Sequence, residues 1–103
     1  MMTRIIMDKL EGNQIIRDHL ILIGMIDGDT SVENGGFLEL HGMINGTCVL
    51  LPGSKTLLRG MVNGNVTNNG GELEIFGMVN GDLIRQEGTT TFDANAVING
   101  NIL

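Results

Sequence analysis

A five-residue motif, glycine–methionine–aliphatic–Asn/Asp–glycine, recurs along this chain of 103 residues. Four copies follow it closely, and a fifth, which begins with alanine, lies near the C-terminus. The copies are GMIDG at 24–28, GMING at 42–46, GMVNG at 60–64, GMVNG at 77–81 and AVING at 96–100. Their first residues are 18, 18, 17 and 19 positions apart. Self-similarity at a short, even period is typical of a solenoid rather than of an ordinary globular domain.

Apolar residues alternate with polar ones on both sides of each motif, which predicts β-strands with one buried face. A helix is excluded because each interior glycine would cost about 1 kcal/mol relative to alanine. Aligning the motifs gives four columns of inward-facing residues. These are Leu20, Leu38, Thr56, Leu73 and Phe92; Leu22, Leu40, Leu58, Ile75 and Ala94; Ile26, Ile44, Val62, Val79 and Ile98; and Thr30, Cys48, Val66, Leu83 and Ile102.

A period of about 18 residues is too short for the helix pairs or propeller blades that form other repeat folds. It matches one coil of a small triangular solenoid whose strands rise about 3.3 Å per residue. We therefore predict an all-β, single-stranded parallel β-helix of about five coils over residues 18–103. Residues 1–17 lack the glycine motif, and we predict that they form an N-terminal cap, either a degenerate coil or a short helix.

A further column is polar and contains Asp27, Asn45, Asn63, Asn80 and Asn99. Stacked amides can hydrogen-bond along the axis of a solenoid, as they do in cross-β ladders. The sequence therefore predicts an asparagine ladder beside the aliphatic columns.

The segments 38–46 (LELHGMING) and 73–83 (LEIFGMVNGDL) resemble the repeats of the bactofilins, which are polymer-forming cytoskeletal proteins of bacteria. The resemblance covers residues 20–103. It implies a right-handed parallel β-helix, no enzymatic activity, and end-to-end assembly into filaments without nucleotide. The sequence also stops at Ile102-Leu103, part-way through a coil, so we expect self-association at this end because an uncovered coil is a template for strand pairing.

The methionine at the second motif position is open to two interpretations. Strict alternation turns Met25, Met43, Met61 and Met78 outward, where they would form an apolar strip together with Ile23 and Phe76. Methionine is common on surfaces that adapt to partners. Alternatively, the backbone bends at the glycine and methionine fills a corner of the core.

The composition excludes several functions. The net charge is −6, and three Phe are the only aromatic residues, so neither a basic patch nor stacking platforms for nucleic acid are expected. The chain shows no targeting or membrane-spanning segment and has one cysteine, which predicts a cytoplasmic protein without disulfides. His19 and His41 lie in different columns, and Cys48 is expected to be a small buried hydrophobe. We expect no catalytic, cofactor or metal site.

Two classes of function remain. The first is a structural protein that self-associates through its ends or its flank, giving a homo-oligomer or polymer. The alternative is an acidic protein that binds another protein, such as an immunity-type inhibitor of a bacterial toxin.

Overall fold

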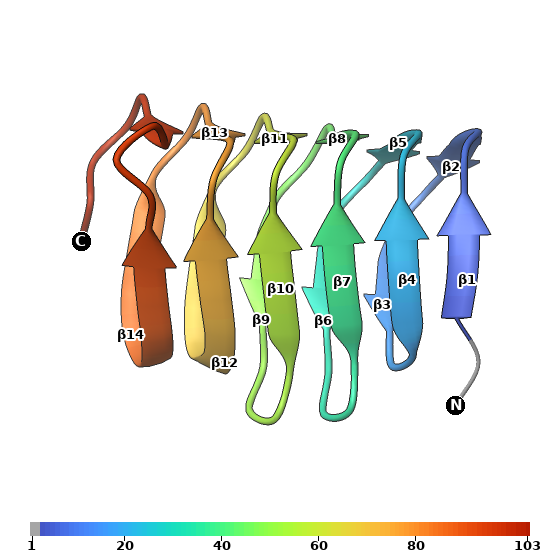
Figure 1. Ribbon diagram of the computed structural model, residues 1–103, viewed down its shortest axis with the longest axis horizontal. Helices are drawn as coiled ribbons and strands as arrows, with labels where there is room; N and C mark the ends of the chain where they lie inside the picture. The colour runs from blue at the N-terminus through green and yellow to red at the C-terminus, as the bar shows by residue number, and fades with distance from the viewer. Residues whose placement is uncertain (1–2) are drawn as a thin grey trace.

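The computed structural model describes residues 3–103 (Figure 1) and confirms the predicted fold class. These residues form an all-β solenoid of about six coils, with equivalent positions about 17 residues apart, and they contain no helix. Every strand pair between coils is parallel. The described ends of the chain lie at opposite ends of the stack, whose longest Cα extent is 32 Å.

The first five coils each contribute one strand segment to each of three faces. The sixth contributes one segment to face 1 and one to face 2, and only an isolated bridge between Leu83 and Ile102 to face 3. Face 1 contains β1 (Thr3–Ile6), β4 (His19–Leu22), β7 (Phe37–Leu40), β10 (Lys55–Leu58) and the second parts of β12 (Val66–Ile75) and β14 (Leu83–Phe92). Face 2 contains β2 (Lys9–Glu11), β5 (Met25–Asp27), β8 (Met43–Ile44), β11 (Met61–Val62), β13 (Met78–Val79) and β15 (Val97–Ile98). Face 3 contains β3 (Gln14–Ile16), β6 (Thr30–Val32), β9 (Cys48–Leu50) and the first parts of β12 and β14. Because β12 and β14 continue around the corner between faces 3 and 1, these two faces form one hydrogen-bonded sheet.

The predicted aliphatic columns stack in direct register through the inner coils. Ile26 pairs with Ile44, which pairs with Val62, and Val62 pairs in turn with Val79. All four side chains are fully buried. Burial of one such side chain contributes roughly 1.5–3 kcal/mol, so the columns supply the main stabilisation of the rod.

The structure adds a fifth inward column on face 3 that the sequence analysis missed: Ile16, Val32, Leu50 and Asn68. Asn68 is a fully buried polar residue in this otherwise aliphatic column. Its Nδ2 donates to the Gly71 and Thr89 carbonyls at 3.1 and 3.0 Å and to Thr90 Oγ1 at 2.9 Å, and its Oδ1 accepts from the Gly71 N–H. These hydrogen bonds offset its desolvation and fix the corner that β12 turns.

The N-terminal residues belong to the solenoid itself. Residues 3–16 contain β1, β2 and β3, and each of these strands pairs in register with a strand of the next coil. Of the two forms predicted for the N-terminal cap, the short helix therefore does not form. The segment 8–12 (DKLEG) is a further copy of the motif, since Leu10 pairs with Ile26. Asp8 occupies the position of the first glycine in this copy.

The last coil follows a different register from the one predicted. Phe92 pairs with Ile75 and Thr90 with Leu73, whereas the motif alignment had placed Phe92 beside Leu73 and Ala94 beside Ile75. The two additional residues lie in a wider turn between β14 and β15, where Ala96 N–H donates to the Asp93 carbonyl at 3.0 Å. Ala94 lies in this turn and is exposed. Phe92 occupies the inward column of Ile75 and is 46% exposed in the last described coil.

Candidate functional site

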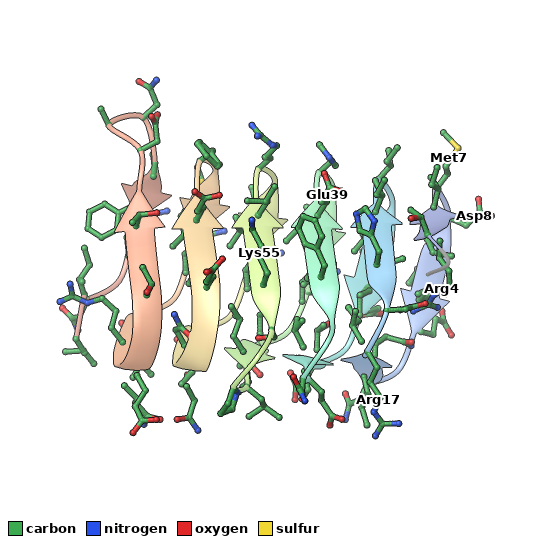
Figure 2. The ribbon with its side chains drawn as sticks, turned by 60° about the horizontal axis from the view of Figure 1, so that its bottom comes forward. Arg4, Met7, Asp8, Arg17, Glu39 and Lys55 are labelled. Atoms are coloured by element: carbon green, nitrogen blue, oxygen red, sulfur yellow. The ribbon has the colours of Figure 1, made fainter. Side chains whose placement is uncertain are left out.

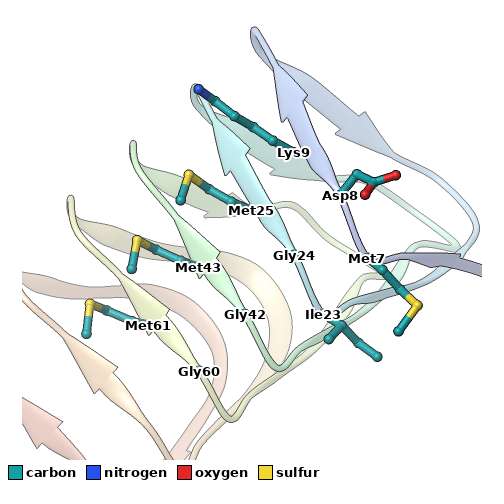
Figure 3. Close-up of a pocket in the computed structure, with 10 residues that line it drawn as sticks. All are labelled: Met7, Asp8, Lys9, Ile23, Gly24, Met25, Gly42, Met43, Gly60 and Met61. Atoms are coloured by element: carbon teal, nitrogen blue, oxygen red, sulfur yellow. The ribbon is translucent and has the colours of Figure 1, made fainter.

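A surface groove runs along the corner between faces 1 and 2, across successive coils (Figure 3). Its volume is about 590 Å³. Met25, Met43 and Met61 form one wall, and Met7 and Ile23 lie on the opposite side. Gly24, Gly42 and Gly60 lie between the two sides and form the floor.

The floor is glycine because each coil approaches the preceding one too closely for a side chain. A Cβ at Gly42 would lie 2.8 Å from the Ile23 carbonyl carbon and closer still to the carbonyl oxygens of Ile23 and Gly24. The same conflict recurs at Gly24, Gly60 and Gly77. Without side chains on this corner, the methionine wall is left open along one side.

The methionines satisfy neither interpretation fully. Met25, Met43, Met61 and Met78 are all half-buried, and each is the direct register partner of the next. Their side chains lie outside the core, and those of Met25, Met43 and Met61 pack along the wall of the groove rather than standing free in solvent.

The asparagine ladder predicted from the sequence is present beside the methionines. Asn63 Nδ2 donates to Asn45 Oδ1 at 2.6 Å, and the same amide-to-amide bond repeats from Asn80 and from Asn99. Three of the amides also approach a thioether of the preceding coil. The Nδ2–Sδ distances are 3.1 Å from Asn45 to Met25, 3.3 Å from Asn63 to Met43 and 3.5 Å from Asn80 to Met61. The asparagine ladder therefore fixes the positions of the Met25, Met43 and Met61 sulfurs as well as those of its own amides.

Ile23 and Phe76, the other members of the predicted strip, lie on the ridge along the far side of the corner. They are 46% and 37% exposed. The Arg59 guanidinium lies 4.5 Å from the centre of the Phe76 ring, so a cation covers part of this aromatic surface. The predicted apolar strip is thus interrupted at Arg59.

The remaining predicted interaction residues, Ile102 and Leu103, lie in the last coil and are 42% and 60% exposed. They belong to a wider pattern. Of nine exposed large hydrophobic residues among residues 3–103, seven lie in the first and last coils: Ile5, Met7, Ile15, Phe92, Val97, Ile102 and Leu103. The inward-facing Ile6, Leu10 and Ile98 of these coils are only partly buried. Both ends of the described rod therefore present apolar surface and strand edges.

Other polar side chains are held in structural contacts. On face 1, His19 Nε2 contacts Glu39 Oε2, its Nδ1 lies 3.0 Å from Thr3 Oγ1, and its ring stacks on Phe37 at 4.6 Å. Figure 2 labels Glu39 and Lys55 of this face. Burial raises the pKa of the Cys48 thiol to about 12, which disfavours the reactive thiolate. Within residues 3–103, no group of three His, Cys, Asp or Glu residues is placed to hold a metal ion.

The part of the chain that the structure describes contains no helix long and apolar enough to cross a membrane. Comparisons with protein-family models, with curated proteins and with solved structures gave no match to this chain.

Proposed function

We propose that this protein is a non-enzymatic, bactofilin-like structural subunit that assembles end to end. The observation that carries the proposal is the incomplete burial of the inward-facing residues of the two terminal coils, Ile6, Leu10, Phe92 and Ile98.

The register of the coils indicates how two copies would join. If the first coil of one copy stacks on the last coil of another, the inward columns continue without interruption. Ile6 then lies over Phe92 and Leu10 over Ile98, because each pair occupies the same column. Such a contact joins two different surfaces, so repetition yields an open filament rather than a closed dimer.

The test compares two variants that each place one lysine on the rod. Ile98→Lys puts a charge into the exposed end of a column, whereas Leu57→Lys puts it on the flank of a middle coil, between Glu39 and Glu74. Sedimentation over a range of concentrations and negative-stain electron microscopy would follow assembly. We expect the wild type and Leu57→Lys to form elongated oligomers and Ile98→Lys to remain monomeric.

A wild-type protein that stays monomeric at high concentration would overturn the proposal. Assembly that survives Ile98→Lys but is lost in Leu57→Lys would place the contact on the flank instead of the ends.

The second candidate function is the binding of another protein by the acidic chain, as in an immunity-type inhibitor of a basic toxin. It is favoured by the net charge of −6 together with the methionine-lined groove. The double variant Met43→Glu/Met61→Glu would abolish such binding while leaving end-to-end assembly intact, so it separates the two functions.

A further inference from the structure

The methionine wall of the groove is a regular array of soft donor atoms. Four thioethers on successive coils are joined by direct register, from Met25 to Met43, Met61 and Met78. Figure 3 shows the side chains of Met25, Met43 and Met61 running parallel to one another, with their sulfurs in corresponding positions. Neighbouring sulfurs are therefore separated by about one strand spacing, roughly 4.8 Å.

This spacing matches the geometry of a metal ion held between two sulfurs. A zinc–sulfur bond measures about 2.3 Å, and two bonds of that order in line span about 4.6 Å. Thioether sulfur is a soft, uncharged donor, and soft sulfur ligands select monovalent copper over calcium or magnesium. Linear coordination by two donors is also ordinary for monovalent copper and silver.

The surroundings of the sulfurs favour the bound state in three further ways. The asparagine amides donate to Met25, Met43 and Met61 at 3.1–3.5 Å, which fixes each sulfur and leaves its second lone pair free for a metal. The glycine floor leaves the wall accessible from the groove. The acidic chain raises the local concentration of cations.

We propose that the methionine ladder binds monovalent copper or silver, with each ion bridging the thioethers of two adjacent coils. Four sulfurs then hold up to two ions, one between Met25 and Met43 and one between Met61 and Met78. The ion enters and leaves without a change of oxidation state, and no proton is released because thioethers are unprotonated. This site does not depend on end-to-end assembly.

Two double variants with the same number of methionines test the proposal. Met25→Leu/Met43→Leu leaves the adjacent pair Met61 and Met78, whereas Met43→Leu/Met78→Leu leaves Met25 and Met61 two coils apart, about 9.6 Å. Leucine conserves the side-chain volume, so both variants are expected to fold. Met1, Met2, Met7 and Cys48 are common to all the proteins, and silver bound there contributes equally.

Silver ion, which is redox-inert, is titrated in chloride-free buffer with calorimetry and with ¹³C-methyl methionine NMR. We expect the first variant to bind one ion fewer than the wild type, and the second to bind two fewer. In the wild type, the methyl signals of the four ladder methionines shift. Equal stoichiometry in the two variants, or ladder methyl signals that do not move, would overturn the proposal. Circular dichroism of both variants confirms that any loss is not due to unfolding.

Discussion

The glycine floor of the corner gives the sharpest prediction about stability, the effect of Gly42→Ala. The added Cβ meets the backbone of the preceding coil, 2.8 Å from the Ile23 carbonyl carbon and nearer still to two carbonyl oxygens. These are backbone atoms of the bend between the paired strands β4 and β5, so no flexible side chain can move aside. The Gly24 carbonyl also accepts a hydrogen bond from the Met43 N–H at 3.0 Å, which any shift between the coils would stretch.

The cost follows from these contacts. Overpacking of a well-packed interior costs about 1–3 kcal/mol, and a conflict with two carbonyl groups belongs at the upper limit or beyond. We therefore expect Gly42→Ala to lower the free energy of unfolding by at least about 3 kcal/mol. For a domain of this size, each kcal/mol corresponds to about 4–8 °C in Tm, so the melting temperature should fall by about 12 °C or more.

Gly35→Ala is the matched control, because it changes the same residue type for a different reason. Gly35 has a φ of +83°, and the nearest atom to an added Cβ is the Arg17 carbonyl oxygen at 3.8 Å. Its cost is the conformational penalty alone, about 1–2 kcal/mol. Thermal and urea unfolding of both variants would measure the difference. If Gly42→Ala is no more destabilising than Gly35→Ala, close approach between coils is not the reason for glycine at this corner.

Three other predictions concern polar groups of the rod. Asn68→Leu should lower the free energy of unfolding by about 1–3 kcal/mol in urea denaturation, since the buried Gly71 N–H loses its acceptor; an unchanged midpoint would contradict this role. Arg4 lowers the pKa of the Asp18 carboxyl from its ordinary value of 3.8, chiefly through hydrogen bonds of 2.6 and 2.9 Å. The stabilisation by this pair is therefore complete above the ordinary pKa and is lost as the pH falls through the lower, folded-state pKa. Because the pair is partly exposed, it is worth at most about 1 kcal/mol, so the Tm difference between wild type and Arg4→Gln should be small at pH 7 and vanish in strong acid. Finally, Cys48 should not react with a thiol reagent at pH 8 until the protein is unfolded by denaturant, because burial raises its pKa to about 12; rapid reaction of the native protein would refute this.

The repeat predicted the fold because a solenoid places chemically matched residues on top of one another. Ile26, Ile44, Val62 and Val79 are recognisable as one column from spacing alone, and the structure makes them direct partners. The asparagine ladder follows from the same logic. The motif could not be recognised in the first coil from the sequence, because Asp8 occupies the position of the first glycine there. That glycine is required only where a preceding coil lies beneath it, which is a tertiary relation and not a local one.

The geometry of the corners between faces is determined by tertiary contacts and could not be predicted from the repeat. The turn from Asp93 to Ala96 is wider than the others, so the last coil shifts its register by two residues. Asn68 looks like a turn residue in sequence, but it is buried because the chain folds its amide back onto Gly71 and the next coil. The methionines became the wall of a groove because the position of their side chains depends on how sharply the backbone bends at each glycine. Alternation along a strand determines which side of the sheet a residue faces, whereas a bend at a corner depends on atoms of the neighbouring coil, about 17 residues away in the chain.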